Sequence, residues 1–141
     1  MSTPFSSLSV AGSGISTMKT WIDAISDNVA NANTVRRTSE DAFQARNVIA
    51  ESVPGGDSIG GTETGGGVRV QKIQLSSGDG VLTFDPTNTL ADAQGLVRRP
   101  NVDLVDQMTS LVIAQRAYSA NVTVFERARD SYLRALEIGK S

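Results

Sequence analysis

Apolar residues recur at helical spacing in two long segments, one near each end of the chain. In the first segment the gaps alternate between three and four residues: Leu8, Ala11, Ile15, Met18, Ile22, Ile25, Val29 and Ala32. The second segment has a similar series: Leu104, Met108, Leu111, Tyr118, Val122, Phe125, Tyr132 and Leu136. This spacing is that of the a and d positions of a coiled coil. We therefore predict helices over residues 5–34 and 100–139 that pack against each other and against other copies.

The second predicted helix carries another apolar line beside the first: Ile113, Ala117, Ala120, Val124 and Ala128. A helix that is apolar on two sides has more surface to bury than one partner helix can cover. Of all the patterns in the chain, this one most strongly favours an oligomer.

The middle of the chain has a different character. Partial alternation of apolar and polar residues predicts strands over residues 43–53, 68–75 and 81–84. Residues 54–67 hold seven of the chain's 13 glycines, which predicts a flexible loop. The expected fold class is mainly α, with the two terminal helices paired as an antiparallel coiled coil and a small β-rich insert between them.

The expected domain division follows the same elements. Residues 1–35 form the N-terminal helix of the coiled-coil domain, residues 36–99 form the insert, and residues 100–141 form the C-terminal helix. Asn101, which follows Pro100, is the expected N-cap of the second helix because its side chain can accept from the first free N–H groups.

The first helix contains glycines and asparagines that bear on how closely, and in which register, it packs against the second helix. Gly12 and Gly14 each cost a helix about 1 kcal/mol relative to alanine, so either the helix breaks there or another backbone approaches closely. Asn28, Asn31 and Asn33 lie near the helix end. We interpret them as buried residues that fix the register of the two helices, while a simple capping region is the alternative.

The second helix offers two candidate polar partners for these asparagines, Arg116 and Asn121. For Arg116, an exposed ion pair with an acidic residue one turn away is the alternative, and such pairs contribute only ~0–1 kcal/mol.

Composition excludes several classes of function. Histidine and cysteine are absent, which rules out Ser-His-Asp and Cys-His catalysis, disulfides and His/Cys zinc sites. The net charge of −2 argues against nucleic acid as a partner, and the pairs Arg36-Arg37 and Arg98-Arg99 are predicted to be solvated loop charges. We expect no catalytic residue, cofactor or metal. A small enzyme built on Asp79, Asp85 and Asp92 is an alternative, although the sequence supplies no base with a pKa near neutrality.

Several short segments together resemble a known family: residues 25–34, 84–86, 100–103, 116–121 and 136–139. Their order and the chain length resemble those of the bacterial flagellar rod and hook proteins, and more narrowly the proximal-rod branch. Four residues depart from the family pattern: Asn88-Thr89, where His-Pro is common, Leu96, where tyrosine is, and Gln107, where glutamate is frequent.

The resemblance implies a non-enzymatic subunit that polymerises into the rod of the flagellar basal body, in the periplasm. It also implies partners: other copies, the rod proteins FlgB, FlgF and FlgG, the rod-base adaptor FliE, the MS ring and the flagellar type III export apparatus. Export would occur without a cleaved signal peptide, and direct membrane insertion is not expected. A coiled-coil adaptor or secretion-system component outside the flagellum is the alternative.

The predicted assembly interface combines the apolar seams of both helices with the polar residues named above. Its members are Leu8, Ile15, Met18, Ile22, Ile25, Asn28, Val29, Asn31, Asn33, Met108, Leu111, Ile113, Arg116, Tyr118, Asn121, Val122, Phe125 and Leu136.

Overall fold

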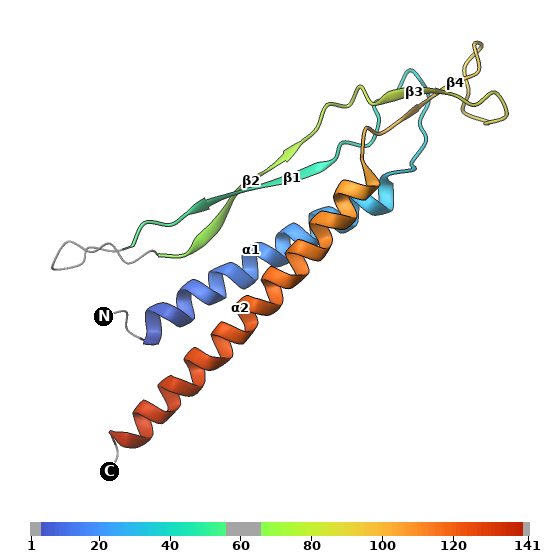
Figure 1. Ribbon diagram of the computed structural model, residues 1–141. Coiled ribbons are helices and arrows are strands. Elements are labelled where there is room, and N and C mark those ends of the chain that lie inside the picture. The colour runs from blue at the N-terminus through green and yellow to red at the C-terminus, as the bar shows by residue number, and fades with distance from the viewer. Residues whose placement is uncertain (1–3, 56–65, 140–141) are drawn as a thin grey trace.

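The computed structural model describes residues 4–55 and 66–139. Two long helices lie side by side, and the strands between them in sequence form two separate two-stranded sheets (Figure 1). The elements in chain order are α1 (Pro4–Asn31), β1 (Arg46–Ser52), β2 (Val68–Leu75), β3 (Val81–Phe84), β4 (Leu96–Arg99) and α2 (Leu104–Ile138). Most of the predicted loop over residues 54–67 lies outside the described residues.

The two helices are in contact along most of α1. Gln107, near the start of α2, is hydrogen-bonded to Asn28 near the end of α1, and Asn121, farther along α2, lies beside Gly14. Since α2 has 35 residues and α1 has 28, α2 extends past the other end of α1 (Figure 1). Residues 129–139 are accordingly exposed.

The β1–β2 hairpin lies along α1 on the side away from α2 (Figure 1). The strands are antiparallel, pairing Arg46 with Leu75 and Ser52 with Val68, with an irregularity between Ile49 and Ala50. Both strands contact α1. This second neighbour explains why α1 is more buried than α2. Most of the small core consists of alanines, three of them from the helices: Ala11, Ala24 and Ala114.

The β3–β4 hairpin lies near the end of α1 and the start of α2 (Figure 1). Its strands are antiparallel, with Val81 opposite Arg99. Arg98 joins this sheet to its surroundings: its backbone pairs with that of Arg36, and its guanidinium donates to the carbonyl oxygens of Thr38 (2.7 Å) and Asp79. The prediction that Arg98 is a solvated loop charge is therefore wrong.

A turn built around Asp92 connects β3 to β4. Its Oδ1 accepts from the backbone N–H groups of Gln94 and Leu96, both at 2.9 Å, and its Oδ2 accepts from the Thr38 hydroxyl at 3.0 Å. Gly95 completes the turn at φ +77°, a conformation that favours glycine. The hydrogen bond from the backbone of Leu96, helped by those from Thr38 and Gln94, lowers the pKa of Asp92.

We expect this turn to make stability depend on pH. Because the pKa of Asp92 is lower in the folded state, its contribution is present above the unfolded pKa of about 3.9. That contribution is lost as the pH falls through the folded value. Asp92→Asn should therefore be less stable than the parent chain at pH 7, and the difference should narrow at pH 3. Urea unfolding at the two pH values measures this, and an unchanged difference would contradict it.

The predicted fold class, a mainly α protein with an antiparallel coiled coil around a small β-rich insert, is wrong. The helices supply about half of the chain, and the strands form two sheets at different places along the molecule. The physical reason is that α1 packs on two sides. Met18, assigned to the coiled-coil seam, also lines a cavity against Val48 of β1.

Two local predictions also need correction. The N-cap of α2 is Asp103, whose side chain accepts from the backbone N–H groups of Val105 and Asp106, so the helix begins later than Asn101 predicts. The strand β4 was not predicted, because its four residues, Leu96–Arg99, include two arginines and show no alternation.

Candidate assembly interface

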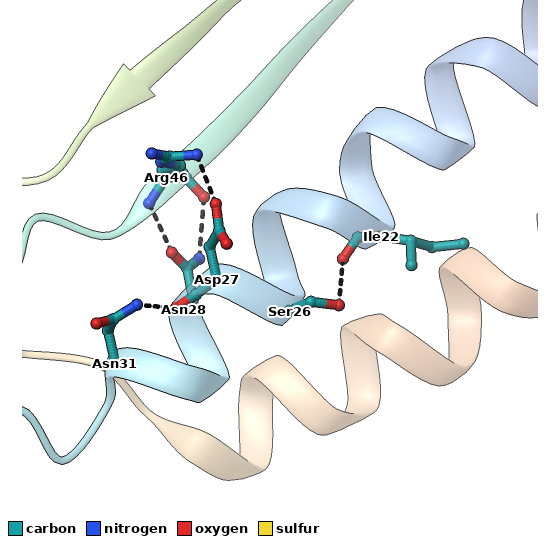
Figure 2. Close-up of polar contacts among 6 residues, drawn as sticks. All are labelled: Ile22, Ser26, Asp27, Asn28, Asn31 and Arg46. Carbon is teal, nitrogen blue, oxygen red and sulfur yellow. Dashed lines mark hydrogen bonds and ion pairs between the residues drawn. The ribbon is translucent and has the colours of Figure 1, made fainter.

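Asn28 is the most connected polar residue between the elements. Its side chain is 1% exposed. Nδ2 donates to the Arg46 carbonyl oxygen and to Gln107 Oε1, both at 3.0 Å, and Oδ1 accepts from the Arg46 N–H at 2.8 Å. The amide thus pairs with the first residue of β1 as a neighbouring strand would (Figure 2). One side chain fixes α1 relative to both β1 and α2.

The polar residues around Asn28 add one further contact to β1 and a set of contacts within the end of α1 (Figure 2). Asp27 forms an ion pair with the Arg46 guanidinium at the surface. Asn31 donates to the Asp27 carbonyl oxygen at 2.9 Å and accepts from the Thr34 hydroxyl at 3.3 Å, and Asn33 is exposed. Of the three asparagines considered together in the sequence, Asn28 carries the link between elements, while Asn31 acts at the end of its own helix.

The glycines of α1 mark the closest approach of the two helices. The helix runs unbroken through Gly12 and Gly14. A Cβ atom at Gly14 would lie 2.8 Å from Asn121 Oδ1, and one at Gly12 would lie 3.9 Å from the Phe125 ring. Close approach, not a break in the helix, is therefore the reason for these small residues.

The residues of the predicted assembly interface fall into three groups by exposure. Ile25 and Asn28 are buried. Half-buried members are Leu8, Ile15, Met18, Ile22, Val29, Asn31, Leu111, Tyr118, Asn121, Val122 and Phe125. Exposed members are Asn33, Met108, Ile113, Arg116 and Leu136. The first two groups already have neighbours within the subunit, so the exposed group is the part most open to a second molecule.

Exposed apolar side chains continue along the outside of α2. Val105, Met108 and Val112 follow one another at helical spacing and are 73%, 54% and 48% exposed; Ile113 and Val124 are 53% and 52% exposed. We call these five residues the outer face of α2. Single exposed apolar residues are common, but a row of them along one helix indicates an interaction surface.

A second exposed apolar region lies where α2 extends past α1. There Leu133 and Leu136 are 49% and 47% exposed. We call residues 129–139 the C-terminal extension. Among the described residues, neither helix, α1 or α2, has an apolar stretch long enough to cross a membrane.

Sequence reasoning missed two residues that join elements. Gln107 attracted notice only as a departure from a family pattern, yet its Oε1 accepts from Asn28. Ser13 lies between the two glycines, and its Oγ accepts from the Val68 N–H at 3.1 Å. Gln107 could have been identified as a contact residue because it is polar and lies within an apolar seam. Nothing in the sequence identifies the contact of Ser13, since its partner is 55 residues away.

Comparison with known proteins assigns the chain to a family. Residues 8–36 match the family "Flagella basal body rod protein", and residues 93–138 match "Flagellar basal body rod FlgEFG protein C-terminal". The chain is 34% identical to the flagellar basal-body rod protein FlgC of Bacillus subtilis over 149 residues, covering 98% of this chain and 99% of the relative.

Relatives in other bacteria give the same result. The flagellar basal-body rod protein FlgC of Yersinia enterocolitica is 35% identical over 131 residues, and that of Salmonella typhimurium is 32% identical over 131 residues; each match covers 93% of this chain and 94% of the relative. The matches do not favour the non-flagellar adaptor. The chain belongs to the FlgC family of flagellar basal-body rod proteins.

Proposed function

We propose that this structural subunit of the basal-body rod polymerises in the proximal rod through the outer face and the C-terminal extension of α2. In this proposal the rod acts as a drive shaft that transmits torque. The observation that supports this proposal is the set of exposed apolar residues along α2, from Val105 to Val124. Burial of one such side chain contributes roughly 1.5–3 kcal/mol, and the contribution recurs at every subunit of a helical polymer.

The contacts within the subunit support this assignment of surfaces. The seam between α1 and α2 is occupied, with Ala114 fully buried and Asn28 bonded to Gln107. A neighbouring subunit therefore has the outside of α2 available to it. A contact between two different surfaces of identical subunits generates an open filament when the rotation from one subunit to the next does not close into a ring.

We further propose which proteins the subunit contacts in the rod and how it is exported. The neighbours are other copies and the rod proteins FlgB, FlgF and FlgG, with FliE and the MS ring at the base. The subunit reaches the periplasm through the flagellar type III export apparatus without a cleaved signal peptide. Within the rod, residues 1–35 and 100–141 form the helical layer and residues 36–99 form a separate part. Membership of the rod family supports these assignments.

Cryo-electron microscopy of purified basal bodies tests the proposal. We expect density for this chain in the proximal rod, with Met108 and Ile113 of α2 against a neighbouring subunit. A chain located outside the rod would contradict the proposed place. A chain inside the rod with the outer face of α2 turned to solvent would contradict the proposed contact surface.

A further inference from the structure

The β1–β2 hairpin is attached to the rest of the molecule through α1. Both strands contact α1 and neither contacts α2. All residues of Arg46–Ser52 and Val68–Leu75 are exposed or half-buried, and none is buried. A two-stranded hairpin is at best marginally stable in water by itself. Its order therefore depends on how it is held against α1.

The hairpin is held firmly at the end where β1 begins. There Asn28 makes two hydrogen bonds to the backbone of Arg46. Next to this point Ala45 is buried, and its backbone is bonded on both sides to Ser76, through the Ser76 hydroxyl at 2.8 Å and the Ser76 N–H at 2.9 Å. This end combines buried backbone bonds with a packed alanine.

At the other end, Ser13 of α1 holds the hairpin. Ser13 Oγ accepts from the Val68 N–H at 3.1 Å while donating to the Val10 carbonyl oxygen. The chain passes close to Ser13 at Gly67, whose φ is +107° and where a Cβ atom would lie 2.3 Å from Ser13 Oγ. A side chain at this position would displace the Ser13 hydroxyl and so disturb its hydrogen bond to Val68.

Between these two ends the hairpin and α1 are not closely packed. A cavity of about 200 Å³, open to solvent, lies between Thr17, Met18 and Trp21 of α1 and Val48 and Ala50 of β1. The backbone irregularity between Ile49 and Ala50 falls at the same place. The middle of the hairpin thus adds little to its attachment.

We propose that the hairpin is a strap on α1, hinged at Asn28 and latched by Ser13, which opens as a unit while α1 and α2 stay paired. Opening breaks the Ser13 bond and widens the cavity beside Trp21. It leaves the bond between Asn28 and Gln107 intact, because that bond joins the two helices. The strap lets the hairpin change its angle to α1 without separating the helices.

Amide hydrogen exchange of the soluble full-length chain, followed by mass spectrometry, tests the strap. In the parent chain we expect β1 and β2 to exchange faster than residues 104–125 of α2, and fastest near Val68. Ser13→Ala removes one neutral hydrogen bond, so exchange in both strands should rise about fivefold, with α2 unchanged. Equal exchange rates for hairpin and α2 in the parent chain would overturn the proposal. So would an equal rise in both after Ser13→Ala, or no rise in the hairpin.

Ser26→Ala is the matched control. Ser26 also donates its hydroxyl to a carbonyl oxygen of α1, that of Ile22, at 2.8 Å but is exposed. It should leave exchange in the hairpin unchanged. Trp21, the single tryptophan of the chain, gives a second readout. Its fluorescence should be quenched more strongly by acrylamide in Ser13→Ala than in Ser26→Ala, and equal quenching would count against opening at the latch.

Discussion

Replacing Asn28 with alanine is expected to lower the free energy of unfolding by about 3 kcal/mol, because a buried polar group left without a partner costs roughly 1–3 kcal/mol. The change leaves the N–H and carbonyl oxygen of Arg46 and the Gln107 side chain without their Asn28 partner. At 1% exposure, the site gives water little access to replace it. Urea unfolding followed by circular dichroism measures the loss.

Two further variants separate the role of Asn28 from that of an asparagine in general. Asn33→Ala removes the same side chain from an exposed position and should change stability by less than about 0.5 kcal/mol. Asn28→Asp keeps an acceptor for the Arg46 N–H but places its second carboxylate oxygen against the Arg46 carbonyl oxygen and Gln107 Oε1, which are both acceptors. It should therefore lower the free energy of unfolding at least as much as Asn28→Ala. Equal effects of Asn28→Ala and Asn33→Ala would contradict the role of Asn28 in fixing α1 relative to β1 and α2.

The two helices were predictable because their apolar spacing is long and regular, but the neighbours of each apolar residue were not. Periodicity identifies the positions that avoid water and does not identify what covers them. Met18 and Ile22 both fit the series of α1, yet Met18 lines the cavity beside β1. The fold class was wrong for this reason: a second neighbour of α1 could not be inferred from the helix alone.

The polar contacts show the same limit at the level of single residues. Asn28, Asn31 and Asn33 are the same residue type and lie within six residues of one another, but their roles depend on the direction in which each side chain points. Asn28 points toward the start of β1, which the chain reaches 18 residues later. Gln107 completes the contact from 79 residues away. Hydrogen-bond partners so distant in sequence become visible only when the packing of the elements is known.

Aspartate substitutions on the outer face of α2 are expected to abolish incorporation into the rod while leaving the free subunit folded. Ile113 and Val124 are 53% and 52% exposed, so Ile113→Asp and Val124→Asp should each change the free energy of unfolding by less than about 0.5 kcal/mol. In a subunit interface the same carboxylate would be buried without a partner, at an effective cost of several kcal/mol. Because every subunit repeats the contact, we expect no detectable variant in purified basal bodies and loss of swimming.

The matched control is Gln74→Asp, which introduces the same charge at an exposed polar position of β2, a strand that does not contact α2. It should support normal swimming and incorporation. Each variant is expressed in a strain that lacks the native chain, and the subunit is quantified in basal bodies by immunoblot beside its level in the cell. Normal incorporation of Ile113→Asp and Val124→Asp would show that the rod is held by other surfaces. In that event the C-terminal extension, where Leu133 and Leu136 are exposed, would become the main candidate for the contact between subunits, because it is the other apolar region of the described helices without a covering element.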